Sequence, residues 1–416
     1  MVLGVSVLVA VIGIGALLTA RVATRATAGG NDAAEADALA LSAIEQALAL
    51  MNAHPNWRTA YQSGQESPPQ ALGRGTFTWR VVDELNGDLA DDPAQPVRLY
   101  GTGSVGQARR VYSVMLRPDG PALEVLKKAA HGDAAFTVNS LATVNATGGP
   151  LSTDGEFRAD GNVKADVEAT NCSGGGFQGA MNKDVKPRAM PSPSALDLYL
   201  FRATAIAWNR VEGGLSGALG PGVNPYGAGN REGIYHVSVP AFGQLRIDNA
   251  RLSATLLVTA GPGARVKVGP SVLWEPPHPY LPSLIVRGSD VKVDLDSSPT
   301  GVGELLAGQS LNPSGMPYNG SSDNDALDTY PSELRGLFHV GGKSAAVVVG
   351  ANLRMNGVLL TDGTITAGDS VLNVTVNASF AADPRIYSDP PAGYTLGERM
   401  VPVEGTWERR PSPAGR

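Results

Sequence analysis

The sequence predicts a mainly β protein with an N-terminal helix, a small α+β head and a β-solenoid body. Three observations predict this class: an uncharged run of 20 residues at the start, a helical apolar pattern after it, and short β-rich segments separated by Gly and Asn from about residue 75 onward. Turns must be frequent, because the 416 residues include 51 Gly and 30 Pro. This length is enough for two or three domains.

The uncharged run Met1–Ala20 predicts a single transmembrane helix. At a rise of about 1.5 Å per residue it spans about 30 Å, the thickness of the hydrocarbon core of a bilayer. With its basic flank, Arg21 and Arg25, it forms the first predicted domain, residues 1–28. A cleaved secretory signal and a soluble core helix are the alternatives. The positive-inside tendency places the two arginines, and with them the rest of the chain, in the cytoplasm. A basic segment upstream of residue 1 would reverse this orientation and allow an exported body.

A second helix is predicted after a flexible joint at Gly29-Gly30. Asp32 offers an N-cap, and its spacing from Glu35 is that of a capping box. Pro55 ends the helix at about residue 54. One face of this helix carries an apolar stripe, which needs a partner surface: Leu41, Ile44, Leu48 and Met51.

Antiparallel strands over residues 75–116 supply that partner, so residues 29–130 form an α+β unit. The run Gly101-Thr102-Gly103-Ser104-Val105-Gly106 matches the dinucleotide-binding fingerprint G-x-G-x-x-G. That fingerprint works only where a helix begins at the glycines and points its N-terminus at the pyrophosphate. Residues 110–116 have a strand pattern instead, so the run is predicted to be a hairpin turn and no cofactor is expected.

Residues 131–388 are predicted to form the solenoid body, with a helical and loop insertion at 171–230 that contains one helix over 193–208. A solenoid is favoured over a sandwich because some strands, such as 345–349, are continuously apolar like buried parallel strands, whereas others, such as 265–268, alternate. Residues 389–416 are predicted to be a C-terminal tail, disordered from residue 409.

The body carries no convincing catalytic signature, and no catalytic, cofactor-binding or metal-binding residue is assigned. Lys292, Asp294 and Asp296 share one side of a strand, as a lyase carboxylate cluster would, but any half-buried strand shows this alternation. The single cysteine, Cys172, excludes an intramolecular disulfide and is expected to be a spectator thiol.

Two loops of the body need weighing as binding sites. Asp323, Asp325 and Asp328 could gather a calcium ion, but the EF-hand spacing and its glycine are absent, so a polar loop is expected. The proline-rich segment Trp274–Tyr280, which contains His278, offers aromatic rings to a sugar or, more simply, caps the end of a solenoid coil.

The N-terminal region resembles the type IV pilins and pseudopilins. The resemblance covers residues 1–130 and lies in the order of an apolar helix, an amphipathic helix and an antiparallel sheet. It is strongest to the minor-pilin type, whose helix carries a stretch like Glu-Ala-Asp-Ala-Leu-Ala, here residues 35–40. The β-rich body resembles the right-handed parallel β-helix domains of bacterial surface proteins. Together these resemblances imply a pilin-like head followed by a right-handed parallel β-helix.

The predicted function is that of a non-catalytic, membrane-anchored structural or assembly protein of a pilus-like or envelope system. The expected location is the cell membrane, with a single pass and the bulk of the chain in the periplasm or at the cell surface. The expected partners are the membrane, subunits of a pilus-like or secretion assembly, and a glycan as a further candidate. Nucleic acid is not expected, because the net charge is -6. The alternatives are a β-helix polysaccharide lyase or hydrolase and a glycan- or protein-binding adhesin.

Overall fold

The computed structural model describes residues 2–54, 56–84, 87–90, 95–368, 375–397 and 399–410, without the side chains of residues 2–11, 13, 193 and 194. The chain forms two compact units. One, called the head, contains the described residues up to 119 and from 397 onward; the other, called the body, contains residues 120–396. The predicted mainly β class, with an N-terminal helix and a solenoid body, is confirmed.

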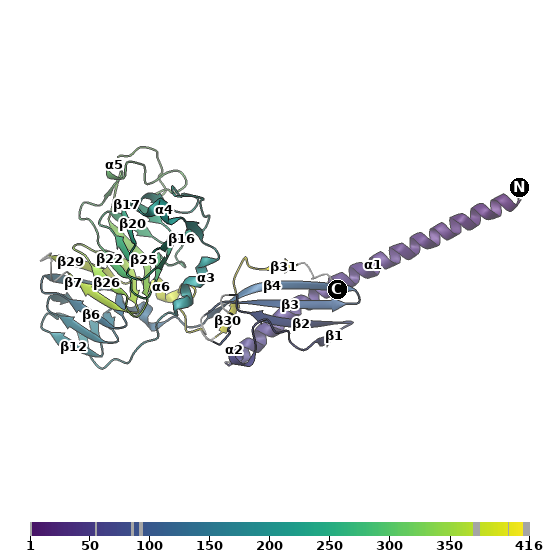
Figure 1. Cartoon of the computed structure of the whole chain (residues 1–416), viewed down its shortest axis with the longest axis horizontal. Helices are drawn as coiled ribbons and strands as arrows, with labels where there is room; N and C mark the ends of the chain where they lie inside the picture. Colours follow the sequence, from purple (N-terminus) through teal and green to yellow (C-terminus); the bar gives the residue numbers. More distant parts are fainter. Residues whose placement is uncertain are drawn as a thin grey trace. The chain divides into compact units, whose positions relative to one another are not determined.

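A single helix, α1 (Val2–Ala53), runs through the predicted joint (Figure 1). The predicted interruption at Gly29-Gly30 is therefore wrong, and so is the capping box that begins at Asp32. A glycine in a helix interior is about 1 kcal/mol less stable than an alanine, but its backbone still makes the helical hydrogen bonds. A long helix therefore tolerates both glycines. Asp32 and Glu35 instead pair with Arg74, whose Nη2 lies 3.2 Å from Asp32 Oδ1. Pro55, the predicted terminator, lies outside the described residues.

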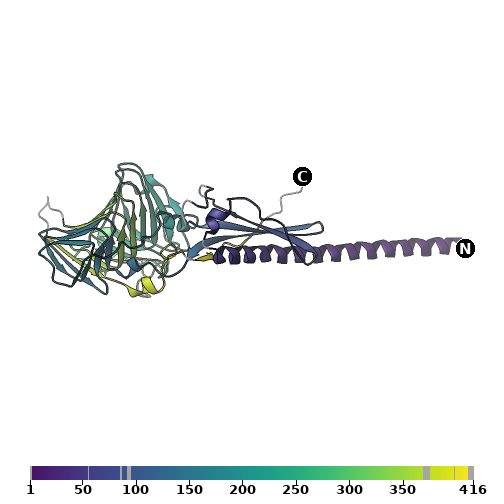
Figure 2. The same ribbon diagram turned by 90° about the horizontal axis from the view of Figure 1, so that it is seen from below.

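The sheet of the head is antiparallel and has the strand order β1-β2-β3-β4-β30, with β31 also paired to β4. It lies along the C-terminal part of α1 (Figure 2). A short helix, α2 (Trp57–Ala60), connects the two. The strands are β1 (Gln70–Leu72), β2 (Gly75–Val82), β3 (Val97–Val105), β4 (Ala108–Asp119), β30 (Arg399–Pro402) and β31 (Glu408–Arg410).

The last two strands come from the C-terminal region, where a tail is predicted. Residues 399–402 align with residues 116–119 of β4, and residues 408–410 align with residues 111–113. The predicted tail over 389–416 is therefore wrong for these two strands; residues 411–416 lie outside the described part of the chain. The body is thus an insertion between β4 and β30, two paired strands of one sheet.

The glycines of the fingerprint-like run are packing residues. Gly101 and Gly103 belong to β3, and the turn follows them at Gly106, so the hairpin begins later than predicted. Residues 108–119 form β4 rather than a helix, which excludes the dinucleotide fingerprint. A β-carbon at Gly103 would lie 2.1 Å from the carbonyl oxygen of Ala36, so these glycines let α1 lie directly on the sheet.

The body is a parallel β-solenoid with three strips of strands, which we call faces A, B and C. Its strands pair in parallel along each face. Face A contains β5 (Ala130–Gly132), β8 (Leu151–Thr153), β11 (Val167–Glu168), β13 (Met181–Asn182), β14 (Thr204–Ile206), β16 (Ile234–Val239), β18 (Thr255–Ala260), β21 (Leu284–Arg287) and the ends of β25 (Glu333–Gly341) and β27 (Arg354–Thr361).

Face B contains β6 (Ala135–Val138), β9 (Glu156–Ala159), β12 (Asn171–Gly174), β19 (Arg265–Val268), β22 (Lys292–Leu295), β26 (Ala346–Val349), β28 (Thr364–Ala367) and the start of β17 (Gln244–Ser253). Face C contains β7 (Ala142–Thr147), β10 (Asn162–Lys164), β15 (Leu215–Leu219), β20 (Val272–Glu275), β29 (Val376–Ala381), the end of β17 and the starts of β25 and β27. Residues 171–230, predicted as a helical and loop insertion, therefore include four solenoid strands, β12–β15.

The spatial order of the coils differs from their order in the sequence. Along face A the strands follow β14-β16-β18-β21-β25-β27-β5-β8-β11-β13. The chain thus enters the solenoid in its middle at β5, coils to one end at β13, and then continues from β14 at the other end. It returns to β27, which pairs with β5. Entry and exit are adjacent, as an insertion into the head requires.

Face A is covered by segments that lie outside the coils. They comprise η1 (Glu124–Lys127), η2 (Pro193–Leu196), α3 (Asp197–Leu200) and α6 (Pro384–Ser388). Leu198 and Tyr199 pack on Leu257 and Ile285, which point outward from face A. The single helix predicted over 193–208 is wrong, because β14 (Thr204–Ile206) pairs with β16 and a separate helix, α4 (Trp208–Val211), follows it.

A second covering segment, residues 296–332, leaves the solenoid between β22 and β25 and packs on face C. It contains β23 (Val302–Gly303), α5 (Glu304–Ala307) and β24 (Thr329–Tyr330). Its apolar residues Leu311 and Met316 pack on Ala218 and Leu273. We call it the face C insertion.

Candidate functional site

The most unusual surface of the head is the N-terminal half of α1. Residues 14–31 are exposed on every side of the helix. The large apolar side chains in this part are between 57 and 73% exposed: Ile12, Ile14, Leu17, Leu18 and Val22. Contiguous apolar surface of this kind marks a site of contact with another protein or with a membrane.

The polar groups of this half-helix are largely satisfied within it. The hydroxyls of Thr19, Thr24 and Thr27 donate to the carbonyl oxygens four residues earlier, over 2.9, 2.9 and 3.0 Å. A threonine bonded in this way presents mainly its methyl group. The surface between Ile12 and Arg21 is therefore suited to apolar surroundings.

The predicted membrane anchor, Met1–Ala20, is not supported by the described residues. In that part of the chain, no helix has both the length and the hydropathy needed to cross a bilayer. Met1 and the side chains of residues 2–11 and 13, more than half of the predicted span, lie outside the description.

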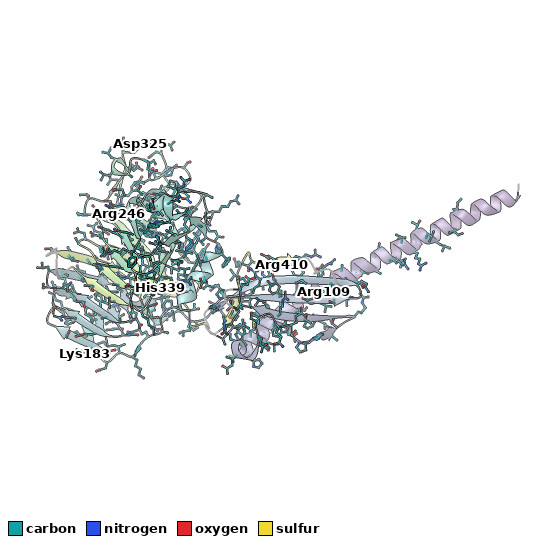
Figure 3. All side chains as sticks on the ribbon, in the orientation of Figure 1. Arg109, Lys183, Arg246, Asp325, His339 and Arg410 are labelled. Atoms are coloured by element: carbon teal, nitrogen blue, oxygen red, sulfur yellow. The ribbon has the colours of Figure 1, made fainter. Side chains whose placement is uncertain are left out.

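The body has a shallow groove on face B, where β19, β22 and β26 lie side by side. Its volume is about 460 Å³, and Arg265, Lys267 and Lys292 line it together with Asp294. The parallel register places Arg265 beside Lys292, about 4.8 Å away along the stack. A second row carries Arg246 of β17, labelled in Figure 3, beside Lys267, which in turn lies beside Asp294. The groove therefore combines the cations of Arg265, Lys267 and Lys292 with the carboxylates of Asp294 and Asp296.

The three residues weighed as a lyase cluster lie at this groove but do not form a carboxylate pair for acid–base chemistry. Lys292 Nζ lies 3.6 Å from Asp294 Oδ1. Asp296 Oδ1 accepts hydrogen bonds from the backbone N–H groups of Ser297 and Asn352, over 2.8 and 3.0 Å, so it holds a turn. The sequence missed the contribution of Arg265 and Lys267, whose alternation was visible but whose position beside Lys292 depends on the stacking register.

The acidic loop lies within the face C insertion, and Figure 3 labels Asp325 there. The carboxylates of Asp323 and Asp325 lie within 4.8 Å of Glu304. Asp323 Oδ2 and Asp328 Oδ2 each accept from Asn312 Nδ2 over 3.3 Å. Glu304 is buried and its oxygens accept from the N–H groups of Leu311 and Asp328 and from Tyr330 OH. Through these hydrogen bonds Glu304 holds the two ends of the acidic loop together.

The proline-rich segment does not form an aromatic platform. Trp274 is fully buried, its Nε1 donates to Ala254 O over 2.8 Å, and its ring lies 5.2 Å from that of Phe338. Nor does the segment cap the solenoid, because β20 pairs with strands on both sides. Of the aromatic rings of this segment, those of His278 and Tyr280 lie outside the core, where they stack at 5.3 Å.

Cys172 is half-buried on β12 and packs against the solenoid core. Burial raises the pKa of its thiol. The thiol is therefore protonated at neutral pH and is a poor nucleophile.

Comparison with known proteins gives only distant matches. No family model matches the chain, and a search of curated proteins finds no match. Among solved structures, the competence-associated pilin ComZ from Thermus thermophilus matches 91% of this chain and 98% of its own, at 11% identity and a TM-score of 0.28.

Two ice-binding proteins match this chain to a similar degree. The protein from the Antarctic ascomycete Antarctomyces psychrotrophicus covers 62% of this chain at 12% identity and a TM-score of 0.24. A domain of ice-binding protein 1 from Shewanella frigidimarina covers 64% at 13% identity and a TM-score of 0.25. Each is matched over 98% of its own length. At these TM-scores the likeness does not indicate a function for this chain.

Proposed function

We propose that this protein is a non-catalytic structural subunit of an extracytoplasmic, pilus-like assembly, joined to it through the exposed segment of α1 over residues 14–31. The observation that carries the proposal is a set of exposed apolar side chains that have no partner within the described part of the chain: Ile12, Ile14, Leu17, Leu18 and Val22. The body is then the part that the assembly displays to its surroundings. Both ends of the body connect to the head, through β4 and β30, so the body does not interrupt α1.

A bundle of several helices fits this surface better than a single partner. Burying the exposed area of one such side chain stabilises a complex by about 1–2 kcal/mol. Five of them only match the cost of association, which is about 4–15 kcal/mol. Because residues 14–31 are exposed on every side, a bundle can bury several faces of the helix at once. Gly15, Ala16 and Ala20 allow helices to approach closely in such a bundle.

Retention in a membrane is the second part of this proposal. Met1–Ala20 has no charged side chain, so the same segment can lie in a bilayer before it is transferred into a bundle. Arg21 and Arg25 would then mark the end of the apolar part. The partners proposed are thus the membrane and neighbouring subunits.

Replacing Leu17 and Leu18 together by Glu tests the assembly role. Neither side chain packs against the head, so the fold should persist, whereas two carboxylates in an apolar bundle should weaken assembly by at least about 100-fold. Sedimentation velocity of the full chain over a range of concentrations measures the assembly, and fractionation of the native host measures retention in the envelope.

Leu72→Glu is the matched control, because Leu72 is an exposed leucine of the head that lies on β1 instead of α1. It should assemble like the wild type. The proposal is wrong if the wild type stays monomeric at all concentrations, or if the Leu17/Leu18 variant assembles as well as the wild type.

A second candidate function, binding of an acidic glycan, is favoured by the groove on face B. Arg265 and Lys267 line it without an ion-pair partner among the described residues, while Lys292 is shared with Asp294. Two pairs of stacked cations, Arg265 with Lys292 and Arg246 with Lys267, place charges about 4.8 Å apart that can contact the carboxylates of a polymer. This role is compatible with the first, since it assigns the groove to the part that the assembly presents.

The double variant Arg265→Ala/Lys267→Ala should bind a polyuronate such as pectate at least about tenfold more weakly, and wild-type binding should fall with added salt. Biolayer interferometry with the immobilised polymer measures both effects. Lys183→Ala, which removes an exposed lysine elsewhere on the body (labelled in Figure 3), should leave binding unchanged. Equal binding to uncharged dextran, or none to pectate, would exclude this role.

A further inference from the structure

Three potential metal ligands meet at the corner between faces A and B, away from the groove. His131 lies on β5 and Asp133 follows that strand, whereas Asp154 follows β8. The two strands are paired neighbours, so their corners stack. One ligand atom from each side chain lies within 4.8 Å of the others. Ligands about 2.0–2.2 Å from one ion are at most about 4.4 Å apart, so the three side chains close slightly around a bound ion.

His131 points an unused nitrogen into this cluster. The ring is 0% exposed, and its Nδ1 lies 2.8 Å from Ser152 Oγ. Its Nε2 has no hydrogen-bond partner among the described residues, and Asp154 Oδ1 lies 3.9 Å away, too far for a hydrogen bond. A buried polar atom left in this way costs about 1–3 kcal/mol. The contact with Ser152 orients the ring as second-shell partners orient a metal-bound histidine.

The hydrogen-bond geometry leaves Nε2 open to a cation. With the Nδ1 proton donated to Ser152 Oγ, the neutral ring presents the lone pair of Nε2 to the cluster. The carboxylates of Asp133 and Asp154 lie close together, and a bound cation would relieve the repulsion between them.

Arg188 would compete with a bound ion for the carboxylate of Asp154. Its backbone N–H donates to Asp154 Oδ2 over 2.6 Å, and its Nη1 lies 3.4 Å from Asp154 Oδ1. Its other guanidinium nitrogen is bound to Glu168, which also accepts from Lys128 Nζ over 2.7 Å. Asp154 Oδ1 is therefore held only loosely. The charged groups around the cluster are Asp133, Asp154, Glu168 and Asp362 against Lys128, Arg188 and Lys343, one negative charge in excess.

We propose that His131 Nε2, Asp133 and Asp154 form a binding site for one divalent transition-metal ion, such as Zn²⁺ or Mn²⁺. An imidazole nitrogen with two carboxylates suits these ions, whereas Ca²⁺ selects oxygen ligands. The ion reaches the site through a cavity of about 470 Å³ that Asp133 lines together with Asp362 and Gly342. Once bound, it ties β5 to β8, the first two coils of the chain.

Titration of the full chain with Co²⁺ tests the site, because ligand-field absorption reports coordination independently of any activity. One equivalent should bind and give a ligand-field absorption in the visible range. Zn²⁺ should displace the Co²⁺, and Zn²⁺ should raise the Tm of the protein. Asp133→Asn should weaken binding at least about tenfold, and His131→Gln should remove the Co²⁺ absorption.

Asp325→Asn is the matched control, since it removes an aspartate from the other cluster of acidic residues, that of the face C insertion. Its Co²⁺ affinity should equal that of the wild type. Because His131 is buried, its variant is informative only if circular dichroism shows a native spectrum; Asp133 reaches solvent, so its variant decides the result. Absence of Co²⁺, Zn²⁺ and Mn²⁺ binding at millimolar concentration, or loss of binding in Asp325→Asn but not in Asp133→Asn, would overturn the proposal.

Discussion

Replacing Arg251 by Met should release the face C insertion and lower the free energy of unfolding of the body by about 3–5 kcal/mol. The side chain of Arg251 is 2% exposed and donates to three carbonyl oxygens of the insertion. The distances are 2.9 Å to Leu311 O, 2.6 Å to Met316 O and 2.8 Å to Pro317 O. Methionine fills much of the space but leaves these oxygens without a donor. Hydrogen exchange followed by mass spectrometry should show faster exchange across residues 304–330.

Arg246→Met is the matched control, because Arg246 lies on the same strand, β17, but is 57% exposed and pairs with Asp248 over 2.9 Å. An exposed ion pair is worth at most about 1 kcal/mol, so exchange in the insertion should not change. Arg251→Lys should fall between the two, since an ammonium group cannot span three carbonyls in the fork geometry of a guanidinium. Unchanged protection of residues 304–330 in Arg251→Met would show that the apolar contacts alone hold the insertion.

Much of the solenoid could be predicted from local patterns. Strands such as 265–268 and 292–295 alternate because one side faces the core, and this period of two is visible in any single strand. Apolar runs such as 345–349 pointed to parallel strands, and β26 is one of them. These patterns identify strands and their inward side chains.

The order of the coils could not be predicted, because an apolar pattern says which side of a strand is buried and not which strand lies beside it. Leu359 pairs with Ala130, residues from opposite ends of the body, and no local signal links them. For the same reason the sequence did not predict β30, because its partner β4 lies on the other side of the whole body in the sequence. The predicted helix over 193–208 failed because its apolar spacing reflects contact with face A by short separate elements.

The candidate surfaces were predictable to different degrees. The apolar character of residues 12–22 is evident from composition, and only its exposure required the structure. The cations of the groove were visible singly, but their alignment depends on the register of three strands. The cluster of His131, Asp133 and Asp154 escaped notice because 21 residues separate His131 from its bonding partner Ser152, and only the coil closes that gap.

Replacing Gly103 by Val should detach α1 from the head sheet. A β-carbon at this position would lie 2.1 Å from Ala36 O and 2.6 Å from Ala40 N, so the helix backbone itself must move. Two fully buried alanines, Ala36 and Ala40, complete the close contact and cannot retract as a flexible side chain would. The expected loss of stability of the head is about 3 kcal/mol or more. Hydrogen exchange should rise in peptides covering residues 36–53 and 97–105.

Ser104→Val is the control for this effect, because Ser104 is the next residue of β3, points to the opposite side of the sheet and is part-exposed. Valine there should be neutral or slightly stabilising, as a β-branched residue in a strand. Peptides from the body, such as residues 234–260, should exchange equally in both variants, since the two units have separate cores. If α1 stays protected in Gly103→Val, the glycine is not required for the helix to dock. If α1 exchanges faster while the sheet stays protected, the sheet folds without the helix docked on it.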